Sequence, residues 1–133
     1  LWLEGCSPDS DLGVIPVNTP ISTSIDTTNG SSMYSTGCGE EISGKEVVIA
    51  FQLQQQANVE LQWKQDGLSD HVFGISKESG DACDASMTGC YDPAGEITGS
   101  TTFNRMNPGN YMLIVDAFSP GDEGKVDVTI IAH

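Results

Sequence analysis

The stretch that most constrains the fold is Asn107–Ala117, which reads NPGNYMLIVDA. A Pro-Gly pair typical of a turn leads into the apolar run Tyr111–Val115, which stops at the acid Asp116. A second turn signal, Ser119–Asp122, follows. Because an apolar run this short between two turns is typical of a buried strand, we expect a core strand here. Its inward side chains are expected to be Tyr111, Leu113 and Val115.

Other segments show the period of two that marks a strand with one buried face. They are Glu46–Leu53, Val59–Lys64 and Lys125–Ala132. Only a short polar turn separates the first two, so we expect them to pair as antiparallel neighbours. Their buried side chains are expected to be Val47, Ile49, Phe51, Leu53, Val59, Leu61 and Trp63.

Further strands are expected at Asp70–Ile75 and Ser100–Met106. In the first, Val72 is expected to be buried, with Phe73 or Ile75 at the margin of the core. Both segments are rich in residues that favour strands and lie between turn signals.

The segment Val14–Ile25 contains Pro16 and Pro20, which suits an edge strand broken by proline rather than a central one. Lys77–Gly89 and Tyr91–Glu96 are expected to be loops, because turn residues and acids dominate them.

Fifteen glycines, six prolines and the near absence of helical periodicity favour an all-β sandwich or barrel. At 133 residues the chain is expected to be one domain. We expect an N-terminal extension with an edge strand over residues 1–24, available as a donor strand, and a sandwich over residues 25–133.

The charge balance argues against two classes of partner. Five basic and 19 acidic residues give a formal charge of -14, which repels nucleic acid and anionic lipid. No apolar run is long enough to span a membrane. The acidic excess fits either a solvated surface or carboxylates gathered around divalent cations.

The four cysteines have no spacing typical of a zinc or thioredoxin site, so we expect two disulfides in an oxidising compartment. A hairpin could close a Cys83–Cys90 bridge, which leaves Cys6–Cys38 to tie the extension to the body. Four cysteines permit three connectivities, so other pairings stay open.

The chain starts at Leu1 rather than Met, and we expect that a signal peptide has been removed. An alternative is lipidation, because Leu3–Cys6 has the outline of a bacterial lipoprotein cleavage box. Glu4 is unusual in such a box, and cleavage there would have removed Leu1–Gly5.

The order of these signals resembles a known family. Asp26-Thr27-Thr28 precedes Cys38-Gly39, and EVVIAFQL follows at Glu46–Leu53. Asp70-His71-Val72 opens a strand, and the paired Cys83 and Cys90 precede Asp92. NPGNYMLIVDA and the terminal EGKVDVTI complete the series. Over Ile25–Ala132 the chain resembles the bacterial pre-peptidase C-terminal domain, in the form common in secreted proteins of deltaproteobacteria.

This resemblance implies a small antiparallel β-sandwich with jelly-roll connectivity and no active site of its own. Such domains occur beside secreted peptidases or in surface proteins, so a secreted or cell-surface location is implied. Some related modules bind calcium or extracellular polymers. The sequence departs from the family at Glu46, where an Asp commonly opens the strand, and this puts an acid-dependent role there in doubt.

Calcium is the cofactor that the composition supports best, because it needs six to eight oxygens of the kind that loop carboxylates supply. Acids at strand ends also cap turns, which is the alternative role. The candidate calcium ligands are Asp9, Asp11, Asp70, Asp92 and Asp116.

No catalytic constellation is visible, and we expect no enzyme activity. His71 and His133 are the only histidines, and no Gly-x-Ser-x-Gly sequence occurs. The aromatic residues that could stack on sugars are Trp2, Tyr34, Trp63, Tyr91 and Tyr111. Trp63 and Tyr111 lie in strand-like runs and favour core packing, whereas Tyr34 and Tyr91 lie in expected loops and suit binding better.

Two functions follow from these observations. The first is a self-associating subunit of an extracellular filament, sheath or surface layer, in which the N-terminal extension adds a strand to a neighbour. Its expected subunit contacts are Leu1, Trp2, Leu3, Val14, Ile15 and Val17. The alternative is an accessory or adhesive domain of a secreted peptidase or surface protein, which recognises polysaccharide or protein.

Overall fold

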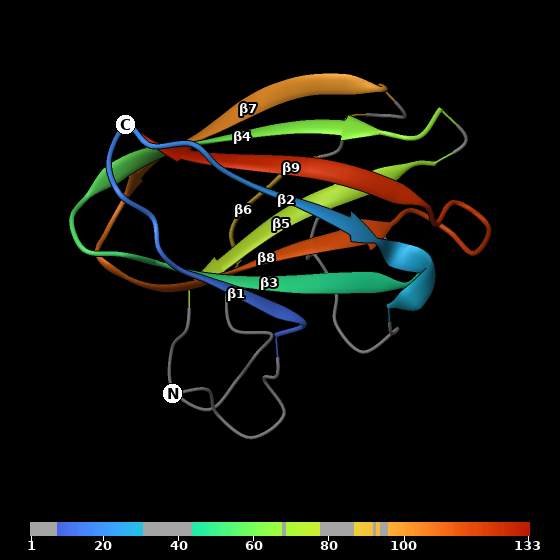
Figure 1. Cartoon of the computed structure of the whole chain (residues 1–133), viewed down its shortest axis with the longest axis horizontal. Helices are drawn as coiled ribbons and strands as arrows, with labels where there is room; N and C mark the ends of the chain where they lie inside the picture. The colour runs from blue at the N-terminus through green and yellow to red at the C-terminus, as the bar shows by residue number, and fades with distance from the viewer. Residues whose placement is uncertain (1–7, 31–43, 68, 78–86, 92, 94–95) are drawn as a thin grey trace.

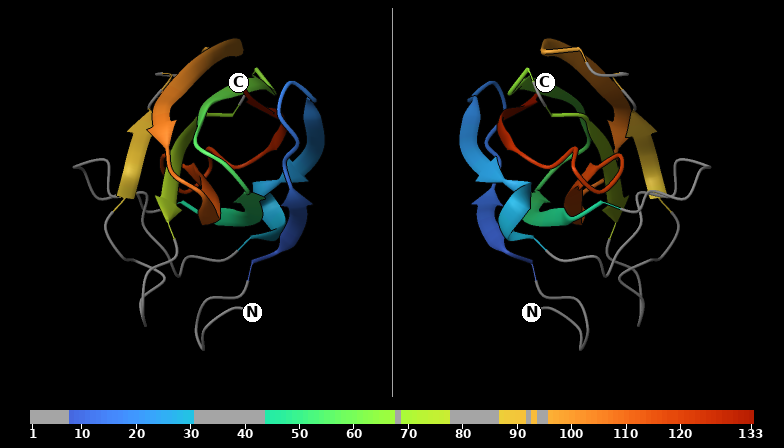
Figure 2. Two further views of the ribbon diagram at one scale, coloured as in Figure 1. Left: turned by 90° about the vertical axis from the view of Figure 1, so that its left-hand side faces the viewer. Right: turned by 90° about the vertical axis from the view of Figure 1, so that its right-hand side faces the viewer.

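The structure is a computed structural model that describes residues 8–30, 44–67, 69–77, 87–91, 93 and 96–133, without the side chains of 87–90. The described residues form nine strands in two sheets that pack face to face (Figure 1, Figure 2). The strands are β1 (Ser10–Val14), β2 (Ile21–Asp26), β3 (Glu46–Leu53), β4 (Ala57–Gln65), β5 (His71–Lys77), β6 (Met87–Tyr91), β7 (Thr98–Met106), β8 (Gly109–Ala117) and β9 (Lys125–Ala132). A short 3₁₀ helix, η1 (Thr27–Asn29), follows β2. No helix among the described residues is long and apolar enough to cross a membrane.

The two sheets have the strand order of a jelly roll. One sheet has the order β2-β9-β4-β7, and the other contains the order β3-β8-β5-β6. β1 lies beside β3 as a fifth strand of the second sheet. The expected all-β sandwich is therefore confirmed, and its connectivity is of the jelly-roll kind.

The expected pairing of Glu46–Leu53 with Val59–Lys64 is wrong, because these strands lie in different sheets. β3 pairs with β8 and β1, whereas β4 pairs with β9 and β7. The turn at residues 54–56 carries the chain across the sandwich instead of closing a hairpin. A period of two identifies the buried side chains, but it is the same for a hairpin and for two strands that face each other across a core.

The N-terminal segment supplies an edge strand to each sheet. β1 pairs with β3 in parallel, while the other ladders between described strands are antiparallel, so the sandwich is not wholly antiparallel as expected. After β1 the chain crosses to the other sheet through Pro16 and Pro20. Val14–Ile25 is therefore the end of one edge strand and most of another, because the prolines occupy the crossing.

Inward side chains from both sheets form one core. The core residues expected for β3, β4 and β8 are all buried, and Phe51 stacks on Tyr111 with ring centroids 5.5 Å apart. The expected marginal position of Phe73 and Ile75 is wrong, since they are 0% and 1% exposed and belong to this core. Val72 is buried as expected, but alternation along β5 places it on the opposite face.

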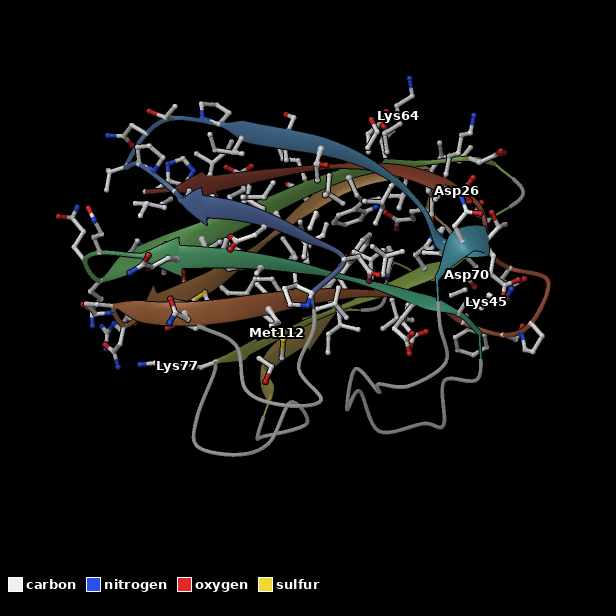
Figure 3. All side chains as sticks on the ribbon, turned by 60° about the horizontal axis from the view of Figure 1, so that its bottom comes forward. Asp26, Lys45, Lys64, Asp70, Lys77 and Met112 are labelled. Carbon is white, nitrogen blue, oxygen red and sulfur yellow. The ribbon has the colours of Figure 1, made fainter. Side chains whose placement is uncertain are left out.

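The outer face of the five-stranded sheet is buried as well. Figure 3 shows Met112 on β8 pointing away from the four-stranded sheet. The buried apolar residues of this outer face are Val48, Ala50, Val72, Met112 and Ile114. Strands buried on both faces have no polar alternation, which is why the sequence misplaced the core side of β5.

β6 lies within a segment expected to be a loop. Its backbone pairs with β5, with Gly74 opposite Cys90. The sequence Met87–Tyr91 has no apolar alternation that could have indicated a strand. Pairing with a neighbouring strand, rather than local pattern, defines this element.

A substitution at Gly99, which packs closely against Trp63, tests the packing of this core. A Cβ at Gly99 would lie 2.5 Å from Cζ2 of Trp63, so Gly99→Ala should displace the indole and lower the free energy of unfolding by about 1–3 kcal/mol. Gly67→Ala is the control, because a Cβ there would meet only Cδ1 of Ile97, at 3.8 Å. Urea unfolding followed by tryptophan fluorescence compares the two, and equal midpoints would contradict the packing.

Candidate functional site

Several sequence-predicted residues meet at one end of the sandwich, which we call the η1 end. η1, the start of β5 and the turn between β8 and β9 form it. Asp26 caps η1 by accepting a hydrogen bond from the Thr28 N–H at 3.0 Å. The main chain of Asp70 donates to the Asp122 carbonyl at 3.1 Å and accepts from the Phe118 N–H at 2.9 Å. Asp26 and Asp70 are both visible at this end in Figure 3.

A buried hydrogen-bond chain joins the elements of the η1 end. Nε2 of His71 lies 2.7 Å from Oγ1 of Thr27, and its Nδ1 lies 2.9 Å from Oε1 of Gln65. Because an amide oxygen only accepts, Nδ1 of His71 carries the proton and Nε2 accepts from the Thr27 hydroxyl. The Thr27 oxygen accepts from the Gly124 N–H at 3.0 Å, and the Gln65 amide donates to the Glu96 carbonyl at 2.5 Å. The chain connects η1, β4, β5 and the turn before β9.

Burial determines the ionisation of His71. Its side chain is 0% exposed, and the loss of solvation lowers the pKa of His71 to about 4, against the opposing attraction of nearby acids. The Thr27 hydroxyl beside it is also inaccessible, at 0% exposure of the residue. The group that orients the imidazole is an amide rather than a carboxylate. This arrangement ties strands together and gives a substrate no access to the hydroxyl.

Asp116 is a fully buried acid that faces a second acid. It lies opposite Glu46 in the β3–β8 ladder, and both are 0% exposed. Side chains at such positions have Cβ atoms about 5 Å apart. Among the described residues, neither carboxylate oxygen of Asp116 has a hydrogen-bond partner. Burial first, and then the charges of Glu46 and Glu123, raise the pKa of Asp116 to about 8. The alternative role as a turn cap is wrong, because Asp116 lies inside β8 and makes no capping bond.

The aspartates expected to bind calcium lie at separate places. Asp9 and Asp11 are on or beside β1, where Asp9 accepts from the Val48 N–H and Asp11 from the Gly13 N–H, each at 2.8 Å. The others are Asp70 and Asp116 at the η1 end, and Asp92, which lies outside the described residues. Within the described part of the chain, no three His, Cys, Asp or Glu side chains are grouped as a metal site requires. Calcium binding therefore stays a prediction.

The residues expected at subunit contacts divide between the core and a surface groove. Ile15 is 3% exposed and belongs to the core, whereas Val14 and Val17 are each 37% exposed. All three line a groove of about 380 Å³ beside the turn between β3 and β4. Outside the described residues lie Leu1, Trp2, Leu3, Cys6, Cys38, Cys83 and the side chain of Cys90. Both disulfide pairings therefore stay predictions.

The sugar-stacking candidates that the structure describes pack against the core. Trp63 and Tyr111 are buried, which confirms their expected core role, and the Tyr111 hydroxyl donates to the Asn107 carbonyl at 2.6 Å. Tyr91 lies in β6 rather than a loop, and its ring packs on Trp63 with centroids 5.3 Å apart. The other two sugar-stacking candidates, Trp2 and Tyr34, lie outside the described residues.

Sequence reasoning missed a surface, the outer face of the four-stranded sheet, which we call the polar face. Its side chains form rows across all four strands, one of Ser22, Thr129, Gln62 and Ser100, and the next of Ser24, Asp127, Lys64 and Thr98. Oγ of Ser22 lies 2.8 Å from Oγ1 of Thr129, and Ser24 donates to Asp127 at 2.5 Å. Alternation indicated which residues point outward, but only the register between strands places them in rows.

Comparison of the sequence with family models and with curated proteins gives no match. Solved structures do match. The pre-peptidase C-terminal domain of collagenase from Bacillus anthracis has a TM-score of 0.56 and 13% identity, over 93% of this chain and 96% of that one. This chain has the fold of a pre-peptidase C-terminal domain. CorA, a surface-associated copper-binding protein of Methylomicrobium album BG8, has a TM-score of 0.58 and 11% identity, over 95% and 98%. The resemblance seen in the sequence is thus supported at the level of fold.

His71 predicts a loss of stability in acid. Its folded pKa of about 4 lies below the ordinary histidine pKa of 6.5, so the neutral ring stabilises the fold at high pH, and protonation removes this stabilisation as the pH falls from 6.5 to 4. The loss relative to pH 7 should reach roughly 3 kcal/mol at pH 4. His71→Asn lacks the titrating group, so its free energy of unfolding in urea should not show this loss. The stability advantage of the wild type over the variant should therefore shrink by that amount between pH 7 and pH 4. A difference independent of pH would contradict this.

Asp116 predicts the opposite trend. Its folded pKa of about 8 lies above the ordinary aspartate pKa of 3.8, so the stabilisation is fully present in acid and is lost as the pH rises through 8. With EDTA present to remove calcium, Asp116→Asn should be more stable than the wild type. The difference in the free energy of unfolding should grow by roughly 1.4 kcal/mol per pH unit between pH 6.5 and 8. Asp127→Asn, at an exposed position of β9, is the control.

The same pair of proteins tests the calcium prediction. If calcium raises the unfolding midpoint of the wild type but not of Asp116→Asn, Asp116 is a calcium ligand, and the advantage of the variant should disappear in calcium. If calcium changes neither midpoint, the expected role of Asp116 as a ligand is wrong.

Proposed function

We propose that this chain is a non-catalytic extracellular module that holds a polysaccharide or protein against its polar face. The observation that carries the proposal is the pair of rows of hydroxyl, amide and charged side chains across the four strands. Neighbouring strands lie about 4.8 Å apart, so these groups present donors and acceptors at a regular spacing. The exposed polar face of a sheet suits holding a partner, whereas chemistry on a small substrate needs an enclosed concave site.

The charge of the chain limits which chemical classes of partner can bind the polar face. The net charge of -14 repels polyanions, and the lysines on the polar face lie among acids, with Lys64 beside Asp127 and Lys125 beside Asp26. A partner rich in hydroxyl or amide groups and low in charge meets this surface without repulsion. The module would bind such a partner through many hydrogen bonds, each contributing about 1 kcal/mol.

The structural neighbours support an extracellular setting for the module. One neighbour is a domain of a collagenase, and the other is described as surface-associated. An accessory domain of a secreted peptidase or of a surface protein fits both. Collagen is accordingly one of the polymers worth testing.

The filament role expected from the sequence has less support, because its donor strands already have partners. β1 pairs with β3 and β2 with β9 in the same chain. The Asp9 N–H donates to the Val48 carbonyl and the Ile15 N–H to the Gln52 carbonyl. The accessory binding role therefore takes precedence over donation of the N-terminal extension.

Retention on insoluble polymers tests the proposed function. Purified protein should sediment with at least one of cellulose, chitin or collagen. Because two hydrogen-bonding side chains are lost, Gln62→Ala with Ser100→Ala should weaken retention roughly tenfold. Gln52→Ala changes an exposed glutamine on β3 of the other sheet, so it should bind like the wild type. No retention on any polymer, or equal loss in the control, would contradict the proposal.

A further inference from the structure

We propose that the free edge of β7 is a docking site for an extended strand, and that its occupant is β7 of a second copy of this chain. β7 pairs with β4 on one side, and no described strand lies on its other side. Figure 1 shows β7 at the outer margin of its sheet. Every second residue of such a strand presents its N–H and C=O to the open edge, where another strand can bind them.

The other three edges are short or interrupted. β1 has five residues, a register shift between Asp11 and Val14, and Gly13 at φ 71°. β6 also has five residues. β2 has six residues and begins directly after Pro20. Short strands, bulges and prolines are the features that prevent edge pairing.

β7 lacks these protections. It has nine residues, no proline, and a regular register with β4 from Thr98 to Phe103. Its irregularity is confined to the far end, where Arg105 has φ 55° and its N–H donates to Oδ1 of Asn58. The regular part, Thr98–Phe103, has six residues, as many as β2, but unlike β2 it does not begin directly after a proline.

The charge of this edge also favours a second copy. From Thr98 to Asn104 the strand carries no charged residue, in a chain with 19 acidic residues. Two such acidic molecules repel least where they meet along an uncharged edge. Ile97, immediately before β7, is 53% exposed and would become more buried in such a contact.

The sequence of β7 suits antiparallel pairing with itself about a two-fold axis. With Thr101 on the axis, Gly99 faces Phe103 of the second copy, on the inner side of the sheet. Gly99 lies opposite Trp63, whose indole covers it, so Phe103 of the second copy would extend the row of inner aromatic rings across the edge beside that indole. On the outer side Ser100 faces Thr102 of the second copy. The two polar faces then become one continuous surface, which gives a repetitive polymer two linked binding sites.

Sedimentation velocity of the purified protein tests the pairing. The dimer fraction should rise with protein concentration, and it should rise again between low salt and about 1 M salt, because salt screens the repulsion between two charges of -14. Thr102→Glu places two carboxylates close to the axis and should weaken dimerisation at least tenfold. Ser22→Glu is the matched control, since it adds the same charge to the same face at the opposite edge, on β2, and should dimerise like the wild type.

Hydrogen exchange gives a second measurement that does not depend on a variant. Alternate amides of β7 should exchange more slowly as the protein concentration rises, while those of β2 should not change. A wild type that stays monomeric at every concentration and salt level would overturn the pairing, as would equal dimerisation of Thr102→Glu and Ser22→Glu. Dimerisation is measured without polymer, and retention below the dimerising concentration, so either proposal can fail alone.

Discussion

The structure depends on the burial of the central strands of the five-stranded sheet on both of their faces. β3, β8 and β5 contribute core residues to one side and a second buried apolar layer to the other. Polar side chains on strands buried in this way are not solvated, so each of them needs a hydrogen-bond partner within the protein or must stay uncharged. The unusual groups of this protein, His71 and the Glu46–Asp116 pair, all lie on these strands.

The two buried titrating groups are both kept uncharged at neutral pH by pKa shifts of opposite sign. Burial lowers the pKa of His71 to about 4 and raises that of Asp116 to about 8. Each shift favours the uncharged form, as expected where water is excluded. The imidazole accepts a hydrogen bond from Thr27 and donates one to Gln65, whereas the carboxyl of Asp116 has no hydrogen bond within the described part of the chain. At the η1 end the polar atoms of the histidine are therefore hydrogen-bonded, whereas the carboxylate of Asp116, on the outer face of the sheet at the same end, has no hydrogen-bond partner among the described residues.

The success of the sequence-based predictions depended on whether one face or both faces of a strand are buried. Alternation in β4 identified the core side correctly, because only one face of its pattern was apolar. The same reasoning failed for Phe73 and Ile75, where both faces are buried and alternation carries no information. It also missed β6, whose strand conformation comes from its pairing with β5. The calcium candidates were chosen by residue type alone, and residue type does not say whether side chains converge.

The amino-acid pattern was enough to predict an acidic β-sandwich with the strand NPGNYMLIVDA at its centre. Turn residues and apolar periodicity are local properties, so they can be recognised residue by residue. The three-dimensional fold was needed to show which strands are neighbours, which polar residues share a face and which edge is left open. Strand pairing joins residues far apart in the chain, and a period of two fits many pairings equally well. The polar face and the free edge of β7, on which the two proposals rest, belong to that second kind of information.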